Sequence, residues 1–255
     1  MKILALDTAT ENCSAALLVD GNVRAQEIEM NRGHAERILP MVDALLADGH
    51  LSLSDLDAIA FGRGPGSFTG VRLAATVTQG LAFGADLGVV PVSDLRAVAQ
   101  RVFGASPTAD PDPSSARVLV CNDARMSEVY WACFERGDEG LARLEGEEHV
   151  GRPGDVRLPQ AWMTAGTTAA GRGFLAYAEA LLAAVPSALL SLPIPSSSPA
   201  APASSAIQFL PRATEVALLA VAEVAAGRLL PPEAALPTYL RDNVAHVAQP
   251  PKPSR

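Results

Sequence analysis

The sequence is poor in cysteine and carries no excess of positive charge. Its three cysteines, Cys13, Cys121 and Cys133, are an odd number with no Cys-x-x-Cys spacing, and each lies in an apolar stretch. This pattern argues against a disulfide framework and predicts buried thiols in a reducing compartment. The net charge is -8 with a pI near 5.0. A protein that itself grips a phosphate backbone normally carries a basic stripe, so we expect any nucleic acid to be held by another chain.

Long uncharged hydrophobic runs are also missing. Near the start only residues 3–6 are apolar before Asp7 interrupts, which is far too short for a secretory signal. The most apolar later segments, residues 174–192 and 216–230, contain charged residues or Pro186. Neither offers the run of about 20 apolar residues that a membrane span needs. We therefore expect a cytoplasmic protein with no membrane role.

The first hundred residues alternate between strand and helix patterns. Asp20-Gly21 lies between two strand-like segments and is a hairpin signal. Helical spacing follows, although Pro40 removes a backbone donor from the first helix, so that this helix either starts near Glu36 or is kinked. The expected strands are residues 2–10, 14–19, 22–30, 58–61 and 89–92, and the expected helices are residues 36–48, 69–84 and 95–103. The order β-β-β-α-β-α-β-α is that of the ribonuclease-H-like unit, an α/β architecture.

The remainder of the chain looks like a shortened second copy of this pattern. Residues 105–115, rich in Pro, Ser and Asp, indicate a linker. We predict strands at residues 117–121, 129–135, 141–145 and 163–165, turns at Asn122-Asp123 and Gly137-Asp138, and helices at residues 174–185 and 214–230 with Thr214 as N-cap. A Pro/Ser-rich insertion at residues 186–206 and the tail after residue 248 are predicted to lack regular structure. The expected lobes are residues 1–104 and 105–255, each a mixed sheet flanked by helices, with the last helix in the second lobe.

The segment from Gly62 to Arg72 joins a predicted strand to a predicted helix and contains four glycines. Glycines there let backbone N–H groups converge, so a phosphate cradle can form. Its candidate residues are Asp7, Thr8, Gly64, Gly66 and Ser67. The segment lacks the Gly-Lys-Ser/Thr ending of a P-loop and the flanking glycines of a Gly-x-Ser-x-Gly elbow. A tight turn with a Ser or Thr helix cap is the competing interpretation.

As a literal string, this segment closely resembles the TsaB (YeaZ) family. The matching strings are Gly-Arg-Gly-Pro-Gly-Ser-Phe-Thr-Gly-Val-Arg at residues 62–72, Ile-Leu-Ala-Leu-Asp-Thr-Ala-Thr at residues 3–10, and shorter matches at residues 34–36, 39–40, 123–130 and 237–241. The resemblance is strong over roughly the first hundred residues and patchy afterwards. It implies an actin-like, two-lobed ATPase fold.

The same resemblance implies a role in forming N6-threonylcarbamoyladenosine at position 37 of tRNA. The family member is a non-catalytic, dimerising scaffold subunit that pairs with itself when alone. Its partners are a catalytic paralogue, TsaD, and an ATPase, TsaE. On this resemblance the chain has no cofactor of its own, since the partner subunits use ATP and Mg²⁺, and it meets tRNA only through the complex.

The sequence can also be searched for a metal site and for the residues of an ATPase active site. The four histidines are His34, His50, His149 and His246. No two of them have the four-residue spacing of a helical metal pair, so we predict no metal site and no catalytic residue, and we expect His34 at the surface or at a helix start. Actin-like ATPases place a permissive glycine in the first hairpin, where this chain has Ala9 after Asp7 and Thr8. The competing interpretation makes Asp7 a strand-end carboxylate satisfied by backbone N–H groups.

Two further polar segments leave two interpretations each. Residues 166–168 and 171–173 can form a residual second phosphate loop or a strand-to-helix turn, and we favour the turn. Asp123, Arg125 and Glu128 can form an acid/base couple or an internal ion pair, and we favour the ion pair.

Two helices carry more apolar or small residues than contact with one sheet requires. The expected interface residues are Ile38, Leu39, Met41, Val42, Leu45 and Leu46 on the first helix and Gly70, Ala74, Ala75, Thr78 and Ala82 on the second. On pattern alone, a helical interface with a second subunit and simple coverage of the sheet are equally supported. The family resemblance favours the interface.

Two other function classes remain as alternatives. An independent ATPase or small-molecule kinase would use the same fold, but the altered hairpin at Asp7 argues against it. A peptidase ranks last, because the sequence shows no His-Glu-x-x-His motif, nucleophile elbow or Cys/His arrangement.

Overall fold

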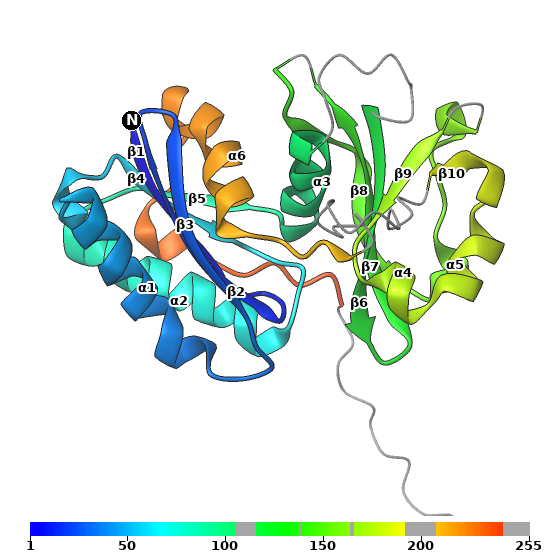
Figure 1. Cartoon of the computed structure of the whole chain (residues 1–255), viewed down its shortest axis with the longest axis horizontal. Coiled ribbons are helices and arrows are strands. Elements are labelled where there is room, and N and C mark those ends of the chain that lie inside the picture. The colour runs from blue at the N-terminus through cyan, green and yellow to red at the C-terminus, as the bar shows by residue number, and fades with distance from the viewer. Residues whose placement is uncertain (106–115, 138, 164–165, 192–207, 242–255) are drawn as a thin grey trace, which may run out of the picture.

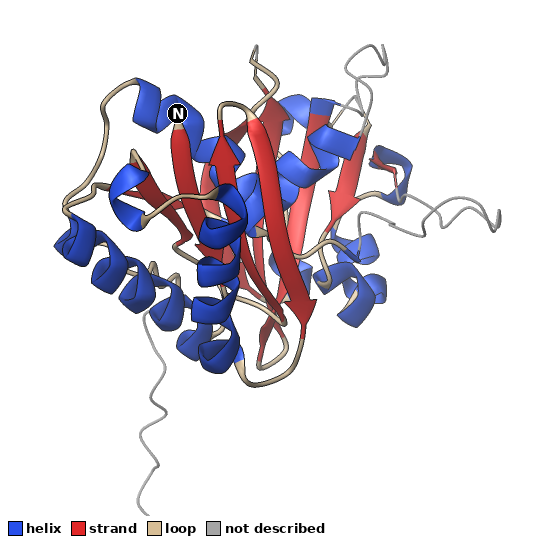
Figure 2. Cartoon of the chain, turned by 60° about the vertical axis from the view of Figure 1, so that its left-hand side comes forward, coloured by secondary structure: helices blue, strands red, loops and turns tan. Residues whose placement is uncertain are grey.

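The strands form two five-stranded sheets, one from each part of the chain (Figure 1). The computed structural model describes residues 1–105, 116–137, 139–163, 166–191 and 208–241. The strand order is β3-β2-β1-β4-β5 in the first sheet and β10-β9-β6-β7-β8 in the second. Helices flank both sheets (Figure 2). The expected α/β class, with two mixed sheets flanked by helices, is confirmed.

The first sheet opens with the predicted three-stranded antiparallel meander. Its strands are β1 (Lys2–Asp7), β2 (Asn12–Val19) and β3 (Asn22–Glu29). Asp20 and Gly21, between β2 and β3, both have positive φ, as the hairpin signal predicted. The further strands β4 (Ala58–Gly62) and β5 (Val89–Val92) continue the sheet in parallel with β1. The carboxyl ends of β1, β4 and β5 therefore meet at one edge.

Two helices, α1 (His34–Gly49) and α2 (Phe68–Ala85), cover one face of the first sheet (Figure 1). Apolar side chains of α1 such as Ile38 and Leu45 share a core with β1, β2 and β4. Pro40 lies inside α1, because the helix already starts at His34, two residues earlier than the predicted start.

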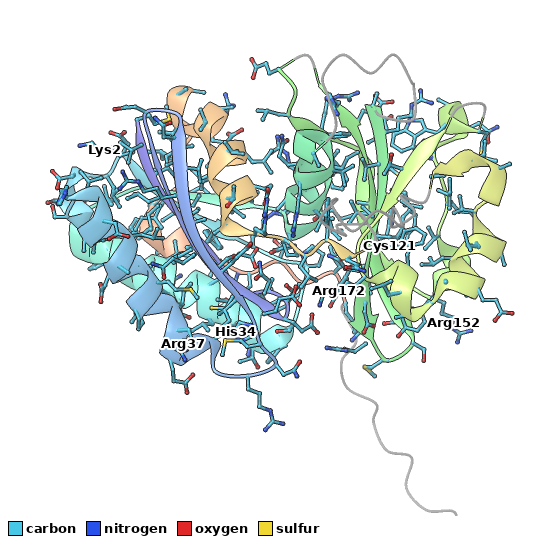
Figure 3. The ribbon with its side chains drawn as sticks, viewed as in Figure 1. Lys2, His34, Arg37, Cys121, Arg152 and Arg172 are labelled. Carbon is cyan, nitrogen blue, oxygen red and sulfur yellow. The ribbon has the colours of Figure 1, made fainter. Side chains whose placement is uncertain are left out.

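The second sheet contains three antiparallel strands and two short parallel ones. The antiparallel strands are β6 (Arg117–Arg125), β7 (Glu128–Arg136) and β8 (Ala142–Gly151). The parallel strands are β9 (Thr167–Ala170), beside β6, and β10 (Leu190–Ser191), beside β9. Cys121, at the centre of this sheet (Figure 3), is a buried free thiol, as are Cys13 and Cys133, which confirms the expected burial.

One predicted turn and one predicted strand of this half are wrong. The turn at Asn122-Asp123 does not form, because both residues continue the ladder with β7, and the chain turns at Met126 and Ser127. The strand predicted at residues 163–165 lies instead at residues 167–170. Met163 ends a short 3-10 turn, and residues 164–165 lie outside the described residues.

The helix predicted at residues 174–185 is two helices, α4 (Gly173–Ala176) and α5 (Ala178–Ala184), on the face of the second sheet away from the first (Figure 1). Tyr177, between them, has φ of -135° and leaves the helical region. The start of the predicted irregular insertion is regular, because β10 joins the sheet edge. The linker at residues 106–115, the rest of the insertion at residues 192–207 and the C-terminal tail at residues 242–255 lie outside the described residues.

Two helices lie between the sheets: α3 (Asp94–Ala105) packs on the second sheet and α6 (Ala213–Ala225) on the first (Figure 1). The predicted helix end at residue 230 and the N-cap at Thr214 are wrong, since α6 ends at Ala225 and Arg212 precedes it. Chain position therefore does not decide which sheet a helix covers, and the division after residue 104 stays a prediction. No helix among the described residues is both long and apolar enough to cross a bilayer.

Candidate functional site

A cleft of about 680 Å³ lies between the two sheets. Its walls are the β1–β2 hairpin, the loop that leads into α1, the glycine-rich segment and the end of β6. Ion pairs join the halves of the molecule, among them Arg125 Nη2 at 2.7 Å from Glu11 Oε1 and Arg172 Nη2 at 2.7 Å from Glu29 Oε2. Arg172 lies between the two sheets in Figure 3. The site therefore combines residues from both lobes.

The glycines of the glycine-rich segment allow close contact with the β1–β2 hairpin. A Cβ at Gly70 would lie 2.0 Å from the carbonyl oxygen of Thr8, and a Cβ at Gly66 would lie 2.5 Å from that of Ala9. The Thr8 hydroxyl donates a hydrogen bond to the Gly70 carbonyl at 2.7 Å. Glycine is required because any side chain would separate the two backbones.

Several backbone N–H groups of the glycine-rich segment donate to acceptors inside the chain. Ser67 N–H donates to the Ala9 carbonyl at 2.7 Å, and Gly64 N–H donates to the Asp94 carboxylate. Ser67 Oγ accepts from Gly70 N–H at 3.0 Å and caps α2. The helix-cap interpretation is confirmed, and the donors at Gly64, Ser67 and Gly70 are not free for a phosphate.

Asp7, the last residue of β1, is fully buried. Its Oδ1 accepts from Ala9 N–H at 3.1 Å, so the interpretation of a strand-end carboxylate satisfied by the backbone holds for this oxygen and not for Oδ2. Its Oδ2 and Asp94 Oδ1 lie on either side of Gly62, where a Cβ would meet them at 2.4 and 2.6 Å. Neither oxygen finds a donor among the described residues when both groups are ionised. One proton shared between the two carboxyls gives both oxygens a partner.

The electrostatics of Asp7 and Asp94 support one shared proton. Burial raises the pKa of both carboxyls, and the neighbouring Asp7 raises the pKa of Asp94 further. The hydrogen bonds with Asp94 and from Ala9 N–H lower the pKa of Asp7, and the hydrogen bond from Gly64 N–H and the charge of Arg63 lower that of Asp94, but burial outweighs them. Two buried carboxylates in contact cannot both be ionised, so the pair titrates as a unit. Asp7 is therefore held in the core and does not face the cleft as a free ligand.

Most residues expected at a partner interface lie inside the chain. Ten of the eleven are buried: Ile38, Met41, Val42, Leu45, Leu46, Gly70, Ala74, Ala75, Thr78 and Ala82. As contact surface these ten are wrong, because helical periodicity marks a buried stripe without saying what covers it. Here the first sheet covers most of it, and Gly70 lies against Thr8 of the β1–β2 hairpin. Leu39 is 44% exposed and remains available.

The remaining polar predictions are resolved by local contacts. His34 starts α1 and its Nε2 donates to the Thr10 carbonyl at 2.9 Å, as expected for a helix-start residue. Arg125 Nη1 lies 3.0 Å from Asp123 Oδ2, which confirms the internal ion pair. Glu128 pairs instead with Arg241.

Residues 171–173 form the favoured strand-to-helix turn. They follow β9 and lead into α4. Gly171 has φ of +92°, and a Cβ there would lie 2.4 Å from the Cys121 carbonyl oxygen. This glycine serves the turn and the close approach to β6.

Asp94 and Asn122 are site residues that sequence reasoning missed. Asn122 is 5% exposed and lines the cleft, and neither polar atom of its side chain has a partner among the described residues. The Asn122-Asp123 pair suggested a turn, so the continuation of β6 through these residues was not predicted. Asp94 could have been found, because it lies two residues after a strand that ends at the same sheet edge as β1.

A family model described as "TsaD: tRNA N6-adenosine threonylcarbamoyltransferase" matches residues 26–249. The tRNA threonylcarbamoyladenosine biosynthesis protein TsaB of Escherichia coli is 39% identical over 250 residues, 96% of each chain. The chain belongs to the TsaB family. The resemblance first seen in the glycine-rich segment is therefore confirmed.

Other members of the TsaB family agree in sequence and in structure. TsaB of Haemophilus influenzae is 50% identical over 132 residues, 52% of this chain and 53% of that protein. The solved structure "YeaZ from Pseudomonas aeruginosa" superimposes with a TM-score of 0.78 at 40% identity, over 94% of this chain and 99% of that chain. The expected actin-like, ribonuclease-H-like fold is thereby confirmed.

Proposed function

We propose that this chain is a non-catalytic subunit in the biosynthesis of N6-threonylcarbamoyladenosine at position 37 of tRNA. The observation that carries the proposal is similarity to the TsaB protein of Escherichia coli over 96% of each chain. The acidic charge of -8 supports a role in which another subunit holds the tRNA. We place this work in the cytoplasm.

The local geometry supports a scaffold more than a catalyst. The Asp7 carboxyl is buried beside that of Asp94, and the N–H groups of Gly64, Ser67 and Gly70 donate to acceptors inside the chain. These are the groups that an actin-like ATPase would direct at phosphate and metal. In this chain they hold the hairpin, the glycine-rich segment and α3 together.

The outer helical face, defined by Leu39 of α1 and Thr76, Gly80, Phe83 and Gly84 of α2, is the proposed partner surface. Phe83 is 77% exposed, and a Cβ at Gly80 or Gly84 would meet no atom within 4 Å. A large aromatic side chain beside small residues lets a second helix approach and provides an anchor for it. This surface replaces the ten buried residues that periodicity indicated.

The proposed partner on this face is a TsaD-type catalytic paralogue, and a second copy of the chain occupies it when the paralogue is absent. A TsaE-type ATPase joins the assembly and uses ATP and Mg²⁺. tRNA then meets this chain only through the complex. This proposal rests on the family relationship and on the exposed apolar side chains of the outer helical face.

Sedimentation of this chain with the TsaD-type paralogue of the same organism tests the surface. Phe83→Arg should abolish the heterodimer and leave a folded monomer by circular dichroism, because it places a charge at the centre of the contact. The matched control is Leu175→Arg on α4, since Leu175 is 53% exposed but lies on the other lobe. Unchanged association of the Phe83 variant would reject this surface.

The cleft supports one alternative, an independent ATPase or small-molecule kinase, because its volume of about 680 Å³ can accept a small molecule. Calorimetry of the purified chain with ATP and Mg²⁺ tests it, and turnover by the chain alone would favour it. A peptidase role has less support. Ser67 Oγ caps α2 and the His34 ring is bound to the Thr10 carbonyl.

A further inference from the structure

A second cavity, of about 410 Å³, shares no lining residue with the cleft described above. We call it the arginine cavity, after the three arginines among its charged lining residues, which are Arg63, Arg96, Arg143 and Glu148. Arg63 follows β4 of the first sheet and Arg96 lies in α3, whereas Arg143 and Glu148 lie in β8 of the second sheet. Three positive groups therefore converge with one negative group where the two halves of the molecule meet.

Glu148 satisfies only part of this positive charge. Its side chain is 7% exposed, it accepts from Arg63 Nη2 at 3.0 Å, and it also accepts from the Ser93 hydroxyl. Arg143 lies at the exposed rim, with its Nη2 at 2.8 Å from Glu135 Oε2 and its Nη1 at 3.4 Å from Glu145 Oε2. Arg63 Nε and Nη1 have no partner among the described residues. The Nε and Nη1 groups of Arg63 therefore remain available as donors, although the charge of Arg63 is paired with that of Glu148.

Arg96, in the first turn of α3, forms no ion pair with any acid among the described residues. Its Nε donates to the Ala142 carbonyl at 2.7 Å, and its two terminal nitrogens bind nothing within the part of the chain that the structure describes. Burial lowers the pKa of this guanidinium, and the one acid that opposes the shift, Glu223, forms an ion pair with Arg228. A half-buried guanidinium without an ion pair of its own is unfavourable, and an anion would relieve that cost.

We propose that the arginine cavity binds a phosphate-class oxyanion, held by the terminal nitrogens of Arg96 and the free donors of Arg63. The planar guanidinium fork matches phosphate oxygens, and two such groups suit a dianion better than the single charge of a carboxylate. The volume leaves room for a phosphate that is part of a larger molecule. Because the lining comes from both halves of the chain, the bound anion would also fix their relative position.

Isothermal titration calorimetry of the full chain with inorganic phosphate tests the site. Ionic strength is held constant with chloride, so that general screening does not imitate binding. We expect saturable binding that Arg96→Gln weakens at least about tenfold, since one charge-assisted contact is lost. Arg24→Gln is the matched control, because Arg24 is an exposed arginine on β3 outside the cavity, and it should bind phosphate as the unchanged chain does.

One further variant and two further ligands test which property of Arg96 and which class of anion the site requires. Arg96→Lys keeps the charge and loses the fork, so its affinity should lie between those of the unchanged chain and the Arg96→Gln variant. Glycerol phosphate tests a phosphate ester, and acetate tests a carboxylate. Acetate binding as tight as phosphate would overturn the phosphate class. Absence of saturable phosphate binding, or unchanged binding by a folded Arg96→Gln variant, would overturn the site.

Discussion

Asp7 and Asp94 face each other across Gly62. Asp7 and Gly62 end β1 and β4, and Asp94 lies two residues after the end of β5; the three strands are neighbours in the first sheet. Because residue 62 has no side chain, the two carboxyls can meet above the middle strand, with Asp7 Oδ2 and Asp94 Oδ1 on either side of it. Their shared proton joins β1 to the start of α3.

The shared proton predicts a stability that falls as pH rises. Burial raises the pKa of both carboxyls above the value of about 3.9 for Asp in an unfolded chain. A group with a raised folded pKa stabilises the fold fully below the unfolded pKa, and this stabilisation is lost as pH rises through the folded pKa. The free energy of unfolding, measured with urea from pH 4 upward, should therefore decline across the titration of the pair.

Asp94→Asn should flatten this decline. The amide oxygen can still accept from Gly64 N–H, and the amide nitrogen can donate to Asp7, so no buried like charge remains. We expect a free energy of unfolding at pH 8 that is higher than that of the unchanged chain by about 1–3 kcal/mol. Asp43→Asn, at an exposed site on α1, is the control and should keep the original pH profile. A profile unaltered by Asp94→Asn would contradict the shared proton.

Gly70→Ala should destabilise the fold by about 3 kcal/mol or more, since the new Cβ would lie 2.0 Å from the Thr8 carbonyl oxygen and force the hairpin away from α2. Gly80→Ala in the same helix has open space around it and should stabilise the chain by about 0.5–1 kcal/mol. Urea denaturation of both variants measures the contrast. Equal effects would show that the contact at Gly70 is not required.

Glu148→Ala should destabilise the fold by about 2–4 kcal/mol, because it leaves the partly buried Arg63 and the Ser93 hydroxyl without their acceptor. Glu145→Ala removes a comparable acid whose side chain is 39% exposed and should change stability by about 0.5 kcal/mol or less. Thermal unfolding of the two variants gives the comparison. A similar midpoint for both would argue against Glu148 as a link between the lobes.

The first lobe could be predicted well from sequence because its signals are local. Asp20-Gly21 marked the hairpin, Ser67 marked the cap of α2, and the strand and helix patterns alternate with clear breaks. In the second lobe the Asn122-Asp123 signal was overridden by the ladder with β7. The turn that forms has positive φ at Arg125, Met126 and Ser127. These residue types seldom adopt positive φ, so no sequence signal marked a turn there.

The site was harder to predict because its contacts are distant in sequence. The backbone contact of Asp7 with Ala9 is local and was foreseen, whereas its contact with Asp94 depends on strand order and on Gly62. The prediction of a partner interface on α1 and α2 was wrong for another reason. Periodicity locates residues such as Ala74 on one stripe but does not distinguish the chain's own sheet from a partner, and the exposed Phe83 lies outside that stripe.

Reconstituted tRNA modification tests the central claim most directly. Threonylcarbamoyladenosine is measured by mass spectrometry in reactions that contain the TsaD-type and TsaE-type proteins, ATP, Mg²⁺, the threonylcarbamoyl donor and tRNA. We predict product only when this chain is added, a loss of product with Phe83→Arg but not with Leu175→Arg, and no product from this chain without the TsaD-type protein. Product formed by this chain without that protein, or undiminished product when this chain is omitted, would contradict the account.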